Sequence, residues 1–148
     1  MEVYAENRKA HFEFEILEAY EAGIELFGFE VKAVRLHRMS LEGSYIFPRG
    51  GELWVVGATI APYQPKNTPA DYNQTRERKL LLHKEEIDHL IGKFSTKGLT
   101  ILPLRVYNIN NKVKIELAVA KKRQTHDKRE RTKERETARK IERTLKEI

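Results

Sequence analysis

The net positive charge of this 148-residue chain is confined to its last 28 residues, which restricts the folded core to the part before them. Residues 1–120 carry 16 Lys and Arg against 16 Asp and Glu, whereas residues 121–148 carry 12 against 6. The basic segment has no Gly, Pro or aromatic residue, and its few apolar side chains are too sparse to form a core. About 120 residues suffice for one core of ordinary size but not for two. The sequence therefore predicts a single domain over 1–120 and a basic tail over 121–148.

Composition excludes several classes of protein. The chain has no cysteine, which rules out a disulfide scaffold and thiolate chemistry, and its polar first ten residues lack the apolar run of a secretory signal, so we expect a cytosolic protein. The longest uncharged stretch, Leu53 to Pro65, contains two prolines and is too short to cross a bilayer. No two histidines have the i,i+4 spacing of a zinc helix, so we expect no metal. The acids Glu85, Glu86 and Asp88 fit the first turn of a surface helix, so we expect no catalytic centre and no cofactor. The five histidines are His11, His37, His83, His89 and His126.

Alternation of apolar and polar residues predicts a mainly β body. Residues 12–16 alternate phenylalanine or isoleucine with glutamate, as a strand with one buried face does, and residues 24–28 predict a second strand. Two hairpins are predicted over 45–56 and 102–119, because each places glycine or asparagine pairs between alternating strands.

Helices and loops complete the expected architecture. Residues 31–37 have helical spacing, and Ile87, Leu90, Ile91 and Phe94 form the apolar stripe of an amphipathic helix. Three prolines over 62–73 predict a long surface loop. About six antiparallel strands with two or three helices are expected, and because an open sheet would leave long edges, we predict a small closed barrel of the oligonucleotide-binding type.

A basic and aromatic segment near the N-terminus is a candidate RNA site. Basic side chains beside flat rings suit unpaired bases, although the two phenylalanines alternate with glutamate and could instead lie in the core. A second basic cluster could clamp phosphates or be an ordinary solvated edge. The first segment comprises Asn7, Arg8, Lys9, His11, Phe12 and Phe14, and the second cluster Arg76, Arg78 and Lys79.

The tail is predicted to contact nucleic acid. Its alternatives are a solubility tail or a coiled-coil strand, and no apolar heptad is sustained for the latter. Acid-before-base pairs at i,i+4 favour a helix, but the tail buries too little apolar surface to order alone. We therefore predict disorder when the tail is free and a helix when it is bound.

Five short motifs, in order along the chain, carry a resemblance to a known family. Together with Lys97-Gly98-Leu99-Thr100 and Lys112-Val113-Lys114, they resemble the SsrA-binding protein family, SmpB, over essentially the whole chain. The five are Asn7-Arg8-Lys9-Ala10, Tyr20-Glu21-Ala22-Gly23-Ile24, Gly28-Phe29-Glu30-Val31-Lys32, Arg76 to His83 as Arg-Glu-Arg-Lys-Leu-Leu-Leu-His, and His126-Asp127-Lys128-Arg129-Glu130.

The resemblance implies an RNA-binding adaptor of bacterial trans-translation. Members have an oligonucleotide-binding-type body that grips the tRNA-like domain of transfer-messenger RNA, and a tail that lies along the empty mRNA channel of a stalled ribosome. RNA contacts are implied for Asn7, Glu21 and Leu81, and a place near the decoding centre for His126. The implied ribosome-binding tail residues, with their basic neighbours, are Lys121, Lys122, Arg123, Asp127, Lys128, Arg129, Arg131 and Lys133.

Two departures and one open role accompany the resemblance. The chain has His11-Phe12 and then Phe14 where the family would have His one place later and a tyrosine, and Lys122 where many relatives have glycine. Because an anion does not help phosphate contact, Glu21 should orient a neighbouring Lys or Arg or accept from a base edge. We expect a monomeric, non-enzymatic adaptor; the alternative is a ribosomal or translation-associated protein with a basic extension.

Overall fold

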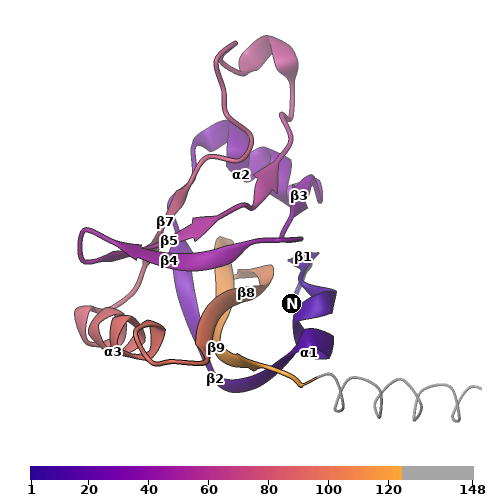
Figure 1. Cartoon of the computed structure of the whole chain (residues 1–148). Helices are drawn as coiled ribbons and strands as arrows, with labels where there is room; N and C mark the ends of the chain where they lie inside the picture. Colours follow the sequence, from indigo (N-terminus) through magenta and orange to yellow (C-terminus); the bar gives the residue numbers. More distant parts are fainter. Residues whose placement is uncertain (125–148) are drawn as a thin grey trace, which may run out of the picture.

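The computed structural model describes residues 1–124 and shows a mainly β protein with three α-helices in that range (Figure 1). The helices are α1 (Arg8–Glu13), α2 (Gly28–Arg35) and α3 (Lys84–Phe94), and one 3₁₀ turn, η1, spans Pro65–Asn67. The strands are β1 (Val3–Glu6), β2 (Phe14–Ile24), β3 (Met39–Ser40), β4 (Tyr45–Arg49), β5 (Glu52–Val56), β6 (Thr59–Ile60), β7 (Arg78–Leu81), β8 (Leu99–Ile109) and β9 (Lys112–Lys122).

Seven strands form one curved sheet in the order β1-β8-β9-β2-β7-β5-β4, and β3 pairs with β6 (Figure 1). The neighbouring pairs are antiparallel, as predicted. The hydrogen-bonded order ends at β1 and β4, so the predicted closure into a barrel is wrong. Both margins are short strands, of four and five residues, and β4 includes Pro48, which lacks the N–H that a further ladder bond needs.

The two predicted hairpins are confirmed. β8 and β9 pair from Leu99 opposite Lys121 to Ile109 opposite Lys112, and the turn residues Asn110 and Asn111 have φ of 50° and 64°. Asparagine tolerates this left-handed region, which a two-residue hairpin turn requires at both positions. Gly50 and Gly51 turn β4 into β5 in the same way, with φ of 61° and 76°.

The predicted strand over 12–16 is wrong in its first half, because Phe12 and Glu13 belong to α1. Asn7 precedes this helix and is held by β8: its backbone N–H donates to Leu104 O at 2.8 Å, and its side-chain nitrogen to Pro103 O at 2.9 Å. α1 then packs Ala10 into a small apolar cluster on β8 and β9. Tertiary contacts therefore override the local alternation.

The predicted strand over 24–28 is also wrong. Ile24 is the last residue of β2, and Gly28 begins α2. The Phe27 N–H donates to Glu30 Oε1 at 2.9 Å, so Glu30 satisfies one of the free donors at the start of the helix. The helix expected from 31 onward thus starts three residues earlier.

The predicted helix around Ile87 is confirmed as α3, which buries Ile87 and Leu90 against the sheet. The main core lies inside the curve of the sheet, with Ile46, Leu53 and Ile115 fully buried. Residues 62–73 form the predicted loop, interrupted by η1 alone. The structure therefore has nine strands over residues 1–124 where about six were expected, since β1, β3, β6 and β7 are short.

The body does not stop at residue 120. β9 continues through Lys121 and Lys122, which pair with Glu15 and Phe14, and the Arg123 N–H donates to Glu13 O at 2.8 Å. The predictions for the tail beyond Gln124, including His126 and Asp127, lie outside the described residues. Within the described part of the chain, no helix has the length and apolarity that crossing a membrane requires.

Candidate nucleic-acid interface

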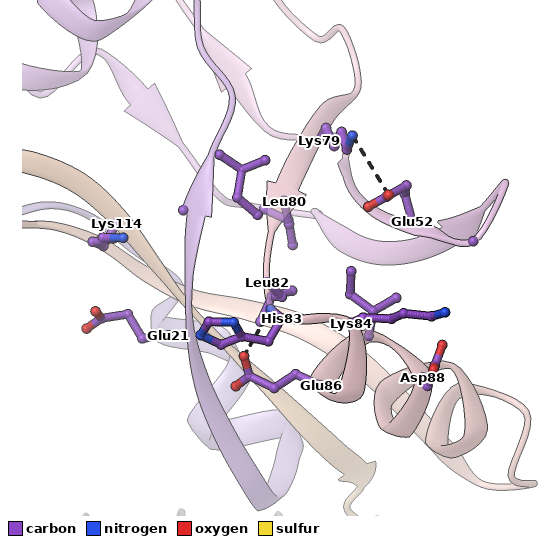
Figure 2. Close-up of a pocket in the computed structure, with 14 residues that line it drawn as sticks. Glu21, Glu52, Lys79, Leu80, Leu82, His83, Lys84, Glu86, Asp88 and Lys114 are labelled. Atoms are coloured by element: carbon purple, nitrogen blue, oxygen red, sulfur yellow. Dashed lines mark hydrogen bonds and ion pairs between the residues drawn. The ribbon is translucent and has the colours of Figure 1, made fainter.

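A groove with a volume of about 880 Å³ opens beside β7, where β2, the β4–β5 turn and the start of α3 meet (Figure 2). It brings together Lys79, from the second basic cluster, and Glu21 and Leu81, for which the resemblance implied RNA contacts. Its charged side chains are four carboxylates and three ammonium groups, so the groove is not a cationic trough. The lining residues are Glu21, Gly23, Gly51, Glu52, Lys79, Leu80, Leu81, Leu82, His83, Lys84, Glu86, Ile87, Asp88 and Lys114.

Glu21 lies on the exposed face of β2 and is held from below by a tyrosine. The Tyr107 hydroxyl, on β8, donates to Glu21 Oε2 at 2.7 Å across the intervening strand β9. Tyr107 is only 2% exposed, and burial together with the carboxylate raises its pKa well above the usual range. The hydroxyl therefore keeps its proton and acts as a permanent donor.

Lys114 is the cation that the sheet places closest to Glu21 in register. Glu21 faces Glu116 on β9, and Lys114 is two residues along the same strand, opposite Gly23. Such diagonal neighbours share a face at roughly 7–8 Å. Neither Lys114 nor Lys84 forms an ion pair within residues 1–124 (Figure 2).

Leu81 presents an exposed apolar side chain to the groove, with 51% of its surface accessible. It pairs with Gly23 in the β2–β7 ladder. A Cβ on Gly23 would lie 3.2 Å from the Leu81 Cβ, closer than ordinary van der Waals contact. The glycine therefore lets Leu81 lie directly against the backbone of β2.

Two of the other three carboxylates at the groove have partners of their own. Glu52 pairs with Lys79 at 3.8 Å, and Glu86 accepts from the His83 N–H at 3.2 Å at the start of α3 (Figure 2). Half-buried Lys79 is thus partly neutralised. A ligand in this groove would face both carboxylate and ammonium groups beside the exposed apolar side chain of Leu81.

Arg78 does not lie in the groove, although the sequence placed it with Lys79 as a phosphate clamp. Its side chain is fully buried, and its Nε and Nη2 donate to Glu30 Oε2 at 3.0 and 2.7 Å. Nη1 donates to Ala58 O and Nη2 also to Gln74 O, both at 2.9 Å. Because these protein acceptors engage the guanidinium, this geometry leaves no route for direct phosphate contact by Arg78.

Arg76 is tied to the same carboxylate. It forms an ion pair with Glu30, its Nε donates to Glu30 Oε2 at 3.2 Å, and its guanidinium lies 4.0 Å from the centre of the Phe27 ring. The Tyr72 hydroxyl donates to Glu30 Oε2 at 2.8 Å. We call Glu30, Tyr72, Arg76 and Arg78 the Glu30 cluster; it joins α2 to the long loop and to β7.

The protonation states in the Glu30 cluster follow from these bonds. Burial alone would raise the pKa of Glu30, but hydrogen bonds from Arg76, the Phe27 N–H, Arg78 and Tyr72 outweigh it and hold the pKa below its ordinary value. Burial and the Glu30 carboxylate raise the pKa of Tyr72 to about 12. The cluster is thus a carboxylate between two guanidinium groups.

Three of the six N-terminal candidates lie at a second, smaller cavity of about 270 Å³, lined by the end of β1, the start of α1 and residues 39–42. Asn7, Arg8 and Lys9 all line it. Lys9 Nζ pairs with Glu42 Oε1 at 2.9 Å, with both side chains exposed. Because Lys9 is already paired with a carboxylate, it is not a free phosphate ligand in this structure.

The aromatic candidates of this segment are less exposed than expected of a stacking platform. Phe12 and Phe14 are half-buried, and Phe14 packs with Ile16 against the small cluster around Ala10, whereas His11 is exposed. Among the tail candidates, Lys121 and Lys122 are exposed and Arg123 is half-buried. The two cavities do not share a lining residue.

Comparison with known proteins places the chain in a family. The model of the SmpB protein family matches residues 4–147. The chain belongs to the SmpB family. An SsrA-binding protein of Thermosynechococcus vestitus is 42% identical over 147 residues, 99% of this chain and 97% of the relative. That of Rubrobacter xylanophilus is 49% identical over 148 residues, again 99% and 97%.

A solved SmpB-related chain agrees with this placement. It comes from a structural study of tmRNA-SmpB at the center of the bacterial ribosome, and it matches with a TM-score of 0.67 and 43% identity. The match covers 84% of this chain and 91% of the solved one.

In this member of the family, the sequence did not predict the roles of three residues that shape the site. Tyr107 and Gly23 act through their neighbours, Glu21 and Leu81, and Glu30 occupies Arg76 and Arg78. Each partner lies far away in sequence. Gly23 and Glu30 belong to motifs quoted above, whereas no motif contained Tyr107.

Proposed function

We propose that this protein is an RNA-binding adaptor that binds the tRNA-like domain of transfer-messenger RNA and delivers it to stalled ribosomes for trans-translation. The observation that carries the proposal is family membership over residues 4–147, joined to one groove that gathers Glu21 and Leu81. In this proposal the protein contributes binding and positioning, and peptide transfer is the chemistry of the ribosome.

The body is proposed to recognise the RNA by shape and by base contacts. The curved sheet would serve as an oligonucleotide-binding-type surface whose exposed strand faces meet RNA, with the groove at its centre. The mixed charge of the groove supports hydrogen bonds to base or ribose groups over a purely electrostatic grip.

The basic tail is proposed to supply the ribosome contact. Residues 121–148 hold all of the net positive charge, and neutralising several phosphates releases counterions, so this contact should weaken steeply with salt. Ordering of the tail on ribosomal RNA belongs to the same proposal, and amide NMR of the free protein tests it.

We propose a binding role without catalysis, in keeping with the family match and with relatives that are described as SsrA-binding proteins. We propose a single copy of the chain per RNA.

Sequencing the RNA that copurifies with the tagged full-length protein tests the proposal. Transfer-messenger RNA should be enriched far above ribosomal RNA when the preparation is washed at high salt. Stoichiometric ribosomal RNA without transfer-messenger RNA would instead identify a ribosomal protein with a basic extension.

A tail deletion tests the division of labour. A chain ending at Gln124 keeps all of β9, and it should bind the tRNA-like domain within about threefold of the full chain while failing to support peptide tagging on stalled ribosomes. Loss of RNA binding in the deletion would contradict the division.

A further inference from the structure

The two oxygens of the Glu21 carboxylate differ in their surroundings. Oε2 accepts the Tyr107 hydroxyl at 2.7 Å, and within residues 1–124 no donor is bonded to Oε1. Tyr107 is buried whereas Glu21 is exposed at the groove, so the bond links a fixed ring to a side chain that would otherwise rotate freely. The tyrosine thereby selects one orientation of Glu21.

The Tyr107 ring has a second contact, with Arg105. The Arg105 guanidinium lies 5.0 Å from the ring centre, and Arg105 Nε donates to Glu116 Oε1 at 3.3 Å. Glu116 stands opposite Glu21 in the β2–β9 ladder. Arg105 therefore contacts Glu116 and the Tyr107 ring, and Tyr107, not Arg105, is the hydrogen-bond partner of Glu21.

Two roles were expected for Glu21: to orient a neighbouring Lys or Arg, or to accept a hydrogen bond from a base edge. This arrangement favours the acceptor role. No Lys or Arg within residues 1–124 forms an ion pair with Glu21, and Lys114 lies diagonally across the ladder from it. A carboxylate without a cation repels phosphate, but it accepts strongly from neutral N–H or O–H groups. The free oxygen suits such a donor on RNA.

We propose that Tyr107 is a positioning residue that holds Glu21 so that its free oxygen accepts a hydrogen bond from an exocyclic base amino group or a ribose 2′-hydroxyl. Lys114, across Gly23, contacts the neighbouring phosphate. The inference deepens the proposed RNA binding and rests on it. In this arrangement the groove recognises one nucleotide: Glu21 contacts its base or ribose, and Lys114 contacts its phosphate.

The test uses the full-length protein and a transcript of the tRNA-like domain. Glu21→Gln turns part of the acceptor into an amide donor, and we expect its dissociation constant to rise at least about tenfold. Tyr107→Phe removes only the hydroxyl and should raise the dissociation constant about fivefold. The double variant should bind no more weakly than Glu21→Gln alone, because both changes disrupt the same contact to RNA.

Tyr20→Phe is the matched control. The Tyr20 hydroxyl also donates to a glutamate of β2, Glu18, at 3.2 Å, but neither residue lines the groove. We expect it to bind RNA like the unchanged protein. Equal affinities for Tyr107→Phe and Tyr20→Phe, or additive effects of Glu21→Gln and Tyr107→Phe, would overturn the positioning role.

Salt dependence separates an acceptor from an orienting group. The logarithm of affinity falls linearly with the logarithm of salt concentration. Lys114→Gln should make this slope less steep by about one unit, since one phosphate contact is lost. Glu21→Gln and Tyr107→Phe should leave the slope within about half a unit of the original. A reduction by a full unit in Glu21→Gln would show that Glu21 orients a cation, and the proposal would fall.

Interference pools identify the donor on the RNA. One pool carries single 2′-deoxy substitutions and another carries base analogues that lack exocyclic amino groups. A substitution that weakens binding to the unchanged protein but not to Glu21→Gln marks the contacted group as ribose or base. Absence of any such position in both pools would overturn the inference, whereas failure of the unchanged protein to bind the transcript would overturn the proposed function instead.

Discussion

The Glu30 cluster and the groove around Glu21 both contain carboxylates and cations, but they distribute them in opposite ways. In the Glu30 cluster one carboxylate is surrounded by two guanidiniums, and Arg78 is completely buried. In the groove Glu21 has a tyrosine as its partner, and Lys114 has no counterion within the described residues. Satisfied charge stabilises the fold, whereas unsatisfied charge at the surface remains available for a ligand.

Breaking the Glu30 cluster should produce the largest effect. Glu30→Gln leaves two guanidiniums without their counterion, and we expect the free energy of unfolding to fall by about 3–5 kcal/mol. Urea unfolding measures this loss. Glu18→Gln is the control, because it removes a carboxylate from the partly exposed Glu18–His89 pair and should cost about 1 kcal/mol or less. Equal losses in the two variants would contradict the distinction between buried and exposed charge.

The same comparison predicts a pH dependence. Because the pKa of folded Glu30 lies below its ordinary value of 4.5, its stabilisation is complete above that value and is lost as the pH falls through the lower, folded pKa. The difference in unfolding free energy between the unchanged protein and Glu30→Gln should be constant near neutral pH and shrink in acid. Urea titrations at several pH values measure it, and a difference that grows on acidification would reverse the assigned sign.

A change in the groove should affect binding but not folding. Leu81→Ala removes an exposed side chain that lies against Gly23, and we expect RNA affinity to fall about tenfold while the free energy of unfolding changes by about 0.5 kcal/mol or less. Leu36→Ala is matched in exposure, at 51% for both residues, and Leu36 lies outside the groove. Gel-shift titration with equal affinities for the two variants would remove Leu81 from the interface.

The smallest effect is expected at the exposed Lys9–Glu42 pair. Hydrogen bonding to Lys9 lowers the pKa of Glu42, and Glu42→Gln should free Lys9 with no measurable change in stability. RNA affinity should rise by less than about threefold at low salt, and the gain should vanish as salt screens the charge. Filter binding over a salt series measures this, and weaker binding by Glu42→Gln would mean that Glu42 orients Lys9 for RNA.

The elements that the sequence predicted are those whose signals are local. Asn110 and Asn111 suffice to turn the β8–β9 hairpin, and the spacing around Ile87 suffices for α3. α1 and the start of α2 were missed because their determinants are contacts across the fold, from Asn7 to β8 and from Glu30 to the Phe27 N–H.

The candidate site shows the same division. Glu21, Lys79 and Leu81 belong to one groove, but only the pairing of β2 with β7 brings them together. The burial of Arg78 could not be predicted from its neighbours in sequence, because an arginine enters a core only with a counterion, and that counterion is 48 residues away.

The margins of the sheet bear on how the molecule behaves at high concentration. A long bare strand offers a template on which identical chains add and polymerise, whereas short or proline-bearing strands deny it. β1 has only four residues, and β4 carries Pro48. We therefore expect the protein to resist strand-by-strand self-assembly, so that a growing supply of it in the cell yields more individual RNA carriers and not fibres.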